Sequence, residues 1–309
     1  MAVNQTQSIS QCSNDPVFVS LGMVVLDERR YPSREPLYDI PGGSGLYATL
    51  GARLVQYSSN PSRIGSIILA GHDFPESLLE QIQAWGMTMQ VKRLHDSPST
   101  RGSLEYQYDD FGRKMFKYLT PPLQPWPSDL ESTTLLNSSC FHILATPDDL
   151  DKHVAALLSR RIQGKPLIIW EPAPLACNNH HINAHLDACR LVDVFSPNHI
   201  ELELLVRGTQ DVHPFSRQAT EYDARSFLDA GVGHDGEGIV VSEAEWLPAF
   251  YDSGSPMVVD TTGAGNAFLG GFSIGLQATK DPQEAAILGS VAASFALEQV
   301  GLPKFTPAS

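Results

Sequence analysis

Several features are scarce in this sequence of 309 residues, and each scarcity excludes a class of protein. Lys and Arg number 21 against 35 Asp and Glu, which gives a formal net charge of -14. A nucleic-acid binder must neutralise phosphates with clustered basic side chains, so we expect no nucleic-acid partner. No apolar run approaches the length of a membrane span, so we expect no membrane partner either.

Cysteine is also scarce. The four cysteines show no Cys-x-x-Cys spacing, which is typical of reduced thiols in a chain of this size. Residues 1–15 are polar and have neither the basic nor the apolar region of a secretory signal. The sequence therefore predicts a cytoplasmic protein with a flexible tail at 1–15 and a single domain at 16–309.

Two nucleotide-binding signatures are missing. The pattern Gly-x-x-x-x-Gly-Lys-Ser/Thr does not occur, and no Gly-x-Gly-x-x-Gly follows the apolar run at 16–22, which we interpret as the first strand. These absences argue against a P-loop enzyme and against a dinucleotide-binding fold.

Apolar segments alternate with helical patterns along most of the chain. From residue 141 onward, short apolar runs at 141–144, 167–170 and 192–195 are separated by stretches such as 150–161. This rhythm is typical of βαβ units. It predicts a doubly wound α/β fold with a mainly parallel sheet, helices on both faces, and ligands at the carboxyl ends of the strands.

A different pattern predicts a small β-hairpin lid. Leu104, Tyr106 and Tyr108 alternate with other residues, and residues 109–112 have the composition of a turn, so we expect an antiparallel hairpin. We assign the lid to segments 23–40 and 97–120.

The most informative segment is Asp260-Thr261-Thr262-Gly263-Ala264-Gly265-Asn266. The apolar run that ends at Val259 predicts a strand before it, and residues 267–269 open an apolar helix after it. The first backbone N–H groups of a helix have no partner within the helix, so such a start can bind phosphate. We therefore expect an anion hole at Gly263, Ala264 and Gly265.

This segment closely resembles a signature of the ribokinase-like (pfkB) family of ATP-dependent sugar and nucleoside kinases, in which it runs Asp-Thr-x-Gly-Ala-Gly-Asp. Further elements occur in the family's order: Gly42-Gly43 before a helix, Gly71-His72-Asp73-Phe74, a hairpin with Gly112-Arg113, and Asn198-x-x-Glu201. Asn266, with Trp246 to Ala249 and Glu298 to Gly301, resembles the fungal maintenance-of-killer branch of this family.

The resemblance implies a substrate site and a phosphate site. A small-molecule sugar or nucleoside would be bound by Asp27, Gly42, Gly43 and Tyr47. The transferred phosphate would be held by Gly263, Ala264 and Gly265. The resemblance also implies a homodimer through the lid.

The resemblance further implies ATP and Mg²⁺ as cofactors. The nucleotide would be bound by Asn198, Glu201, Gly236, Thr262 and Gly265. Glu201 would organise Mg²⁺ through water, and Asp260 lies where many relatives bind a monovalent cation, which makes K⁺ a further expected ion. Asn198 and Glu201 also have the spacing of a helix capping box, so a structural role stays open beside the functional one.

One departure from the family motif bears directly on catalysis. The last residue of the signature is the family's catalytic base, an Asp, and here it is Asn266. An amide cannot accept the proton of an acceptor hydroxyl, so phosphotransfer should fall by about 10²- to 10⁴-fold. The anion hole does not depend on that carboxylate, so nucleotide binding is less affected than turnover.

Two further departures affect binding. Tyr47 replaces an asparagine that binds a sugar hydroxyl in the family, and it would stack on a base or fill the pocket. The glycine-rich turn that forms part of the nucleotide site in relatives is not found after residues 239–241, and the glycines around Gly236 precede this run.

These observations favour a pfkB-type kinase homologue that binds a small molecule and a nucleotide, with weak or absent phosphotransfer. One alternative is an active sugar or nucleoside kinase in which another carboxylate or water accepts the proton. A second alternative is a non-catalytic interaction protein on the same fold.

Overall fold

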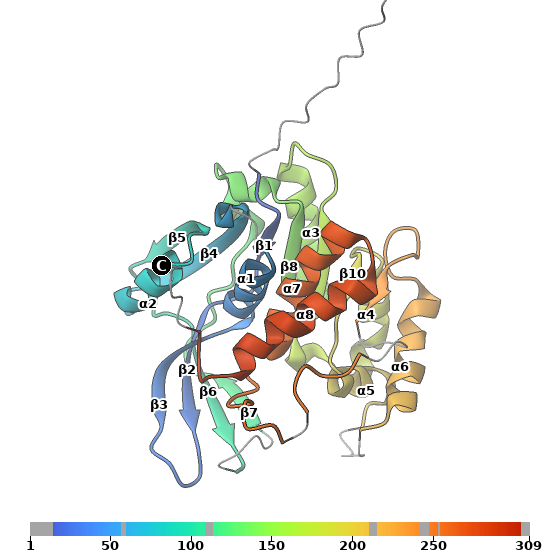
Figure 1. Cartoon of the computed structure of the whole chain (residues 1–309). Coiled ribbons are helices and arrows are strands. Elements are labelled where there is room, and N and C mark those ends of the chain that lie inside the picture. The colour runs from blue at the N-terminus through green and yellow to red at the C-terminus, as the bar shows by residue number, and fades with distance from the viewer. Residues whose placement is uncertain are drawn as a thin grey trace, which may run out of the picture.

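The architecture consists of a large sheet between two layers of helices and a small second sheet at one end (Figure 1). A computed structural model describes residues 15–56, 60–108, 114–209, 215–241, 247–252 and 254–303. The predicted tail at 1–15, apart from its last residue, and the predicted turn at 109–112 with Arg113 lie outside these ranges.

The large sheet has the order β11-β10-β9-β8-β1-β4-β5, and all its neighbouring strands are parallel. Its strands are β1 (Phe18–Ser20), β4 (Ile64–Gly71), β5 (Thr88–Leu94), β8 (Cys140–Ala145), β9 (Leu167–Pro172), β10 (Val194–Phe195) and β11 (Ile239–Val240).

The helices that cover the large sheet are α1 (Ser44–Val55), α2 (Glu76–Gln83), α3 (Pro147–Arg160), α4 (Ile182–Cys189), α5 (His199–Arg207), α6 (Arg217–Ala230), α7 (Ala264–Thr279) and α8 (Pro282–Leu297). Short 3₁₀ helices lie at Pro61–Arg63, Pro127–Leu130, Thr134–Asn137, Pro174–Ala176 and Asn179–His181.

Alternation along the strands divides the hydrophobic core into two halves. Successive side chains of a strand point to opposite faces, so Phe18 packs with α1, α2, α7 and α8, whereas Val19 packs with α3, α4, α5 and α6. The predicted doubly wound α/β fold with helices on both faces is therefore confirmed.

The small sheet has the order β3-β2-β6-β7. Its strands are β2 (Val25–Arg30), β3 (Leu37–Gly42), β6 (Arg101–Tyr106) and β7 (Lys114–Tyr118). Strands β6 and β7 form the expected antiparallel hairpin, and β2 pairs parallel with β6. Figure 1 shows this lid sheet beyond the large sheet, below the end of α8.

One sequence prediction is wrong. Residues 258 and 259 do not end a strand, because residues 258–260 are irregular and their backbone bonds to a helix instead. The N–H groups of Val259 and Asp260 both donate to the carbonyl of Leu297 at the end of α8, at 2.7 and 3.1 Å. The chain therefore reaches the start of α7 along α8, outside the sheet.

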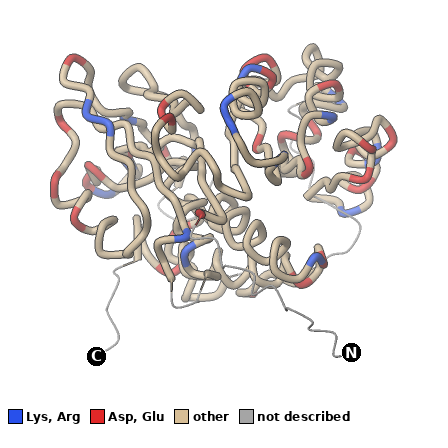
Figure 2. The backbone as a smooth tube through the Cα atoms, turned by 90° about the horizontal axis from the view of Figure 1, so that it is seen from above, with Lys and Arg blue, Asp and Glu red and all other residues tan. Residues whose placement is uncertain are grey.

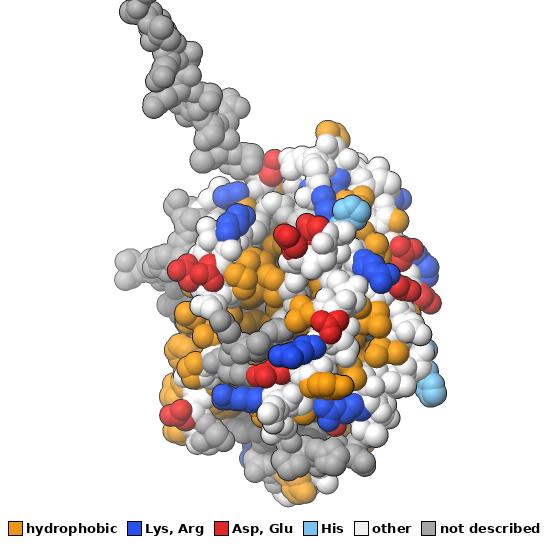
Figure 3. All heavy atoms as spheres, turned by 90° about the vertical axis from the view of Figure 1, so that its right-hand side faces the viewer, with side chains coloured by type: hydrophobic (Ala, Val, Ile, Leu, Met, Phe, Trp, Pro, Cys, Tyr) orange, Lys and Arg blue, Asp and Glu red, His pale blue; other side chains and the backbone are white. Residues whose placement is uncertain are grey.

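Charge and hydropathy are distributed as the composition suggests. Figure 2 shows Lys and Arg interspersed with more numerous Asp and Glu along the backbone. Figure 3 shows hydrophobic side chains exposed between charged ones on the face nearest α6. None of the helices in the described ranges combines the length and the apolar character needed to cross a membrane.

Candidate active site at the carboxyl ends of the strands

The predicted anion hole lies at the N-terminus of α7. Gly263 caps this helix in the left-handed conformation, with φ 81°. The ring of Tyr47 occupies the place where a Cβ of residue 263 would lie, so only glycine fits there. The corresponding place at Gly265 is open, with no neighbouring atom within 4 Å. The helix start therefore has one packed side and one side that an anion can approach.

A carboxylate lies directly beside Asn266. The Nδ2 of Asn266 donates to Oε2 of Glu171, at the end of β9, over 2.6 Å. The same oxygen is 3.1 Å from Nε2 of His142 in β8, whose Nδ1 is 2.8 Å from Oγ of Ser20 in β1. Three neighbouring strands and α7 thus bring four polar side chains into one line at the carboxyl edge of the sheet.

The carboxylate indicates the roles of the groups in this line. A carboxylate accepts, so the tautomer of His142 with its hydrogen on Nε2 donates to Glu171, and its Nδ1 then accepts from the hydroxyl of Ser20. Ser20 Oγ also accepts from the backbone N–H of Gly22 at 3.0 Å. Oε2 of Glu171 therefore accepts two hydrogen bonds, whereas its Oε1 has none with the described residues.

A second cluster of charge is buried between the lid and the anion loop. Arg29 of β2 forms an ion pair with Asp260, and both side chains are almost completely buried. Asp27, on the same strand, is also buried. Burial raises its pKa to about 7, against the opposing effects of Arg29 and Lys114. At neutral pH a large fraction of Asp27 is therefore protonated.

Lys114 connects the lid to the anion loop. Its Nζ, from β7, donates to Oγ1 of Thr262 at 2.7 Å. The N–H of Thr262 in turn donates to Oδ1 of Asp260 at 3.0 Å, and the Tyr106 hydroxyl lies 3.1 Å from Oγ1 of Thr262. Burial lowers the pKa of Lys114, whereas Asp260 opposes this shift. A lid cation is thus held beside the loop that is built for an anion.

Asn198 and Glu201 form the capping box of α5. Asn198 Oδ1 accepts from the N–H groups of Ile200 and Glu201, and Glu201 Oε2 accepts from the N–H of Asn198, each at 2.9 Å. Burial is the main cause that raises the pKa of Glu201 to about 8, with the nearby Glu171 carboxylate adding to the shift and the hydrogen bonds with Asn198 opposing it. The structural role of this pair is therefore present, and its acidic member also faces a second carboxylate.

The other predicted substrate residues lie around the lid cluster. Gly42 ends β3 against the carboxylate of Asp27, and Gly43 precedes α1 with φ 93°. Tyr47 is buried, and burial is the main cause of its raised pKa, with Arg29 opposing the shift. Its ring fills space beneath Gly263, which matches one of the two roles expected for it.

Two predicted residues fit their proposed ligands less well. Gly236 lies in the loop after α6, where no atom lies within 4 Å of the place that a Cβ would take. The structure does not bring it into contact with the clusters above. Asp260 already has a cation beside it in Arg29, which argues against K⁺ at this position. The described residues include no cluster of three or more His, Cys, Asp or Glu side chains suited to a metal ion.

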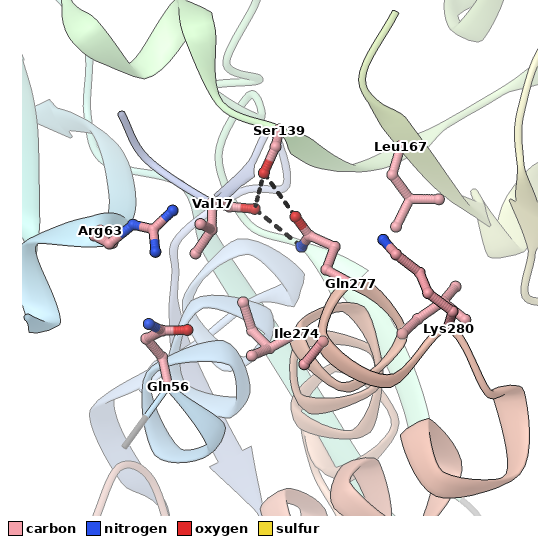
Figure 4. A pocket seen from close by; sticks show the side chains of 10 residues that line it. Val17, Gln56, Arg63, Ser139, Leu167, Ile274, Gln277 and Lys280 are labelled. Carbon is pink, nitrogen blue, oxygen red and sulfur yellow. Dashed lines mark hydrogen bonds between the residues drawn. The ribbon is translucent and has the colours of Figure 1, made fainter. Parts of the chain in front are cut away.

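A separate cavity of about 630 Å³ lies at the opposite, amino end of the large sheet (Figure 4). Its wall includes Val17, Ser139 and Leu167 near the starts of three strands, and Arg63 and Lys280 point into it from two sides. Because ligands of open α/β sheets bind at the carboxyl ends of the strands, this cavity is not the predicted site.

Sequence reasoning missed four residues of the candidate site: Arg29, Lys114, His142 and Glu171. The position of Glu171 in the sequence could have identified it, because it directly follows the predicted strand at 167–170, at the edge of the sheet where ligands were expected. Arg29 and Lys114 lie in or beside the predicted lid strands, but no pattern in the sequence identifies their partners.

The fold and this site define an α/β protein with a glycine-rich helix start, a small second sheet beside it and adjacent carboxylates. The sequence model of the pfkB family carbohydrate kinases matches residues 41–308. The chain therefore belongs to the pfkB family, as its motifs predicted.

The curated relatives include two fungal proteins that match over most of their length. The chain is 30% identical to uncharacterized protein C16C9.01c of Schizosaccharomyces pombe, covering 95% of this chain and 88% of that protein. It is also 30% identical to protein MAK32 of Saccharomyces cerevisiae, covering 94% and 86%. The expected resemblance to the maintenance-of-killer branch is thereby confirmed. A shorter match, 47% identical over 47 residues, links 15% of the chain to 13% of inositol 3-kinase of Arabidopsis thaliana.

Solved structures show the same fold at low sequence identity. Adenosine kinase from Schistosoma mansoni, in complex with 2-fluoroadenosine, gives a TM-score of 0.69 at 14% identity over 94% of this chain and 98% of that one. Ribokinase from Giardia lamblia gives 0.67 at 18% identity, over 94% and 96%. An Escherichia coli protein assigned as a ribokinase II, in complex with ATP and Mg²⁺, gives 0.63 at 16% identity, over 93% and 94%.

Proposed function

We propose that this protein is an ATP-dependent phosphotransferase that acts on a hydroxyl of a sugar, polyol or nucleoside, with Glu171 as the base. The observation that carries the proposal is the 2.6 Å contact between Asn266 and the Glu171 carboxylate. Weak or absent phosphotransfer was expected because position 266 has no carboxylate. Glu171 supplies one from the adjacent strand, so the alternative of an active kinase with another base is favoured.

In the proposed reaction, the acceptor hydroxyl gives its proton to Oε1 of Glu171. Its oxygen forms a bond to the γ-phosphorus of ATP, and the bond from that phosphorus to the β,γ-bridging oxygen breaks, so ADP leaves with that electron pair. Asn266 and His142 hold Oε2 of the same carboxylate, which orients Oε1 toward the acceptor. His142 is thus a positioning residue, supported by Ser20.

Charge on the transferred phosphate would be stabilised from two sides. The free backbone N–H groups at the start of α7 would donate to the oxygens of this phosphate. Lys114, held at Thr262, adds a cation from the lid. Together they form an electrostatic clamp that water would otherwise weaken, and lid closure would exclude that water.

The Glu201 carboxylate fits Mg²⁺ bound largely through water and phosphate, close to the base Glu171. Proteins usually bind Mg²⁺ through only one or two carboxylates. The raised pKa of Glu201 reflects burial and the proximity of Glu171, and a divalent cation would relieve the repulsion between them. Mg²⁺ would supply charge neutralisation on the phosphates, and Asn198 would keep Glu201 in place through the capping box.

The adenine base of ATP would lie on the segment before the anion loop. Val259 and Phe295 remain 46% and 41% exposed where this segment runs along the end of α8. Such apolar side chains next to an anion hole offer a surface for a purine ring. Gly236 was also expected to bind the nucleotide, and this role stays a prediction.

The lid also offers a surface for self-association. Tyr38 on β3 and Met115 on β7 are 61% and 71% exposed, at opposite edges of the lid sheet. Exposed apolar side chains on sheet edges are a common basis for pairing between copies. We therefore keep the homodimer through the lid as part of the proposal, with the sedimentation mass of the full chain as its test.

The experiment that tests the proposed function measures ADP release from ATP and Mg²⁺ with a panel of acceptors. The panel includes ribose, adenosine and myo-inositol, since these correspond to the kinases named among the similar proteins. We expect turnover with one acceptor at an ordinary kinase rate of about 1 to 100 s⁻¹. ATP binding without turnover by any acceptor would favour weak phosphotransfer, and no ATP binding by the folded protein would favour the interaction protein.

A further inference from the structure

Arg29 has donors that the protein does not use. Its side chain is completely buried, and Nη1 forms the ion pair with Asp260. Nε and Nη2 have no hydrogen-bond partner among the described residues. The Tyr47 hydroxyl lies beside the guanidinium and acts on it both through charge and as a weak hydrogen-bond partner, but no contact of full hydrogen-bond geometry joins it to Nε or Nη2.

Unsatisfied buried donors are rare because each one costs about 1 to 3 kcal/mol. A native structure retains them where a ligand or water completes the bonds. The Nε and Nη2 groups of an arginine point in parallel from one edge of the planar guanidinium, and this edge matches two oxygens of a carboxylate or phosphate. The orphaned atoms of Arg29 therefore have the geometry of an anion seat.

The charges around this edge also favour an anion. Asp260 balances Arg29, while Lys114 adds a second positive charge close by. Burial raises the pKa of Asp27, the other carboxyl of the cluster, to about 7, so this group is only partly ionised at pH 7. When Asp27 is protonated, Arg29 and Lys114 face only the Asp260 carboxylate, which favours a further negative group.

The seat lies in the proposed acceptor site. Arg29 and Asp27 both belong to β2 of the lid, and Asp260 opens the segment that leads to the anion loop. The Tyr47 ring, which acts on Arg29, packs directly against Gly263. A group bound to Arg29 is therefore close to the phosphate that the anion loop would hold. Arg29 is fully buried in this conformation, so an acceptor would reach its free edge only if the lid sheet moved away.

We infer that the acceptor substrate carries an anionic group, a carboxylate or a phosphate, that binds the Nε and Nη2 edge of Arg29. This inference rests on the proposed function, because it names the substrate class of the same site. Sugar acids and phosphorylated polyols share this chemistry, whereas neutral sugars and nucleosides leave the edge unpaired.

The experiment compares matched acceptors that differ only in the anionic group. The pairs are glucuronate with glucose, and myo-inositol phosphate with myo-inositol. Calorimetry gives the dissociation constants for the full chain, and ADP release is measured in parallel. We expect the anionic member of at least one pair to bind about tenfold more tightly or better, because charge-assisted hydrogen bonds are the strong ones. The pair that shows this preference identifies carboxylate or phosphate.

Arg29→Lys is the most informative variant, because it keeps a cation beside Asp260 and removes the edge formed by Nε and Nη2. It should abolish the preference for the anionic member, so that the two members of each pair bind alike. Arg101→Lys is the matched control. Arg101 also lies in the lid sheet, but its partners are Asp39 and Asp73 near the surface, so its replacement should keep the preference.

Equal or weaker binding of the anionic members by the natural protein would overturn the inference, and so would a full preference retained by a folded Arg29→Lys. If that variant does not fold, the preference of the natural protein decides alone. ADP release with neutral acceptors and no anionic preference would leave the proposed function standing and remove the inference. Selective anion binding without ADP release would support the inference about Arg29 and remove the proposed function.

Discussion

The two ends of the large sheet are built in contrasting ways. At the amino end, Gln277 of α7 donates to the carbonyls of Val17 and Ser273 at 3.0 and 3.1 Å, and its own carbonyl accepts from Ser139 at 2.6 Å. These polar groups form hydrogen bonds with one another and attach α7 to the sheet, beside the cavity of Figure 4.

At the carboxyl end, the same helix begins among buried groups that are not satisfied in this way. Asp27 and Glu201 are both held with raised pKa values, and Arg29 keeps two unused donors. Such costs are typical of sites that are arranged for a ligand rather than for stability. The contrast supports the proposal that the carboxyl end holds the functional site and that the amino end attaches α7 to the sheet.

The largest expected effect is on Glu171. Glu171→Gln keeps the acceptor for Asn266 but removes the base, so kcat should fall by about 10²- to 10⁴-fold, with ATP binding nearly unchanged. The measurement is steady-state ADP release with the acceptor found in the panel, beside ATP calorimetry. A kcat equal to that of the natural protein would show that the base lies elsewhere.

The next effect separates packing from anion binding at the start of α7. Gly263→Ala forces a left-handed residue against the Tyr47 ring, so unfolding should become easier by about 2 to 4 kcal/mol. Gly265→Ala is its matched partner, because a methyl group there meets open space. It should leave stability equal or up to about 1 kcal/mol higher, while weakening ATP binding.

Chemical denaturation and ATP calorimetry on both glycine variants check this pair. Equal stability of the two variants would contradict the packing of Tyr47 under the loop. Undiminished ATP affinity in Gly265→Ala would contradict the position of the anion hole.

A smaller effect concerns the pH dependence of stability. The pKa of Asp27 is raised from 3.8 to about 7, so between these values the folded protein keeps a proton that the unfolded chain releases. The natural protein therefore loses stability as pH rises through this window. Asp27→Asn removes the loss, so relative to the natural protein it should be more stable at about pH 8 than at about pH 5 by on the order of 2 kcal/mol.

Denaturation curves of both proteins at the two pH values test this shift. A stability difference that does not change with pH would show that Asp27 is ionised in the folded protein throughout the range.

The smallest effect belongs to the amino end. Gln277→Ala removes the bonds to Val17 and Ser273, and should lower the free energy of unfolding by about 1 kcal/mol. It should leave kcat unchanged, because no part of the proposed site depends on these bonds. A marked loss of turnover in a fully folded Gln277→Ala variant would show that the amino end also contributes to turnover, which contradicts the contrast between the two ends.

Much of the fold followed from local patterns in the sequence. The alternation of apolar runs with helical stretches predicted the parallel sheet, and the alternating residues before the turn predicted the β6–β7 hairpin. The predicted strand at Val259 failed because the backbone there bonds to the end of α8 instead of to a strand, and the Val259 side chain stays 46% exposed. An apolar run reveals neither its burial nor the partner of its backbone.

The candidate site was predicted where motifs are local and was missed where distant segments meet. The helix start at Gly263 can be recognised from seven consecutive residues. The contact between Asn266 and Glu171 joins positions 95 apart in the chain, and the Arg29–Asp260 pair joins positions 231 apart. Position 266 alone therefore suggested lost chemistry, whereas the fold brings the Glu171 carboxylate into contact with that residue.

The most direct test of the central claim is kcat after Asn266→Asp, measured in the natural protein and in Glu171→Gln. If Glu171 is the base, Asp at 266 places two carboxylates in contact and leaves kcat of the natural protein equal or lower, but it restores turnover in Glu171→Gln by moving the base to the family's position. A rise of about 10²- to 10⁴-fold in the natural protein, with no effect of Glu171→Gln alone, would contradict the account.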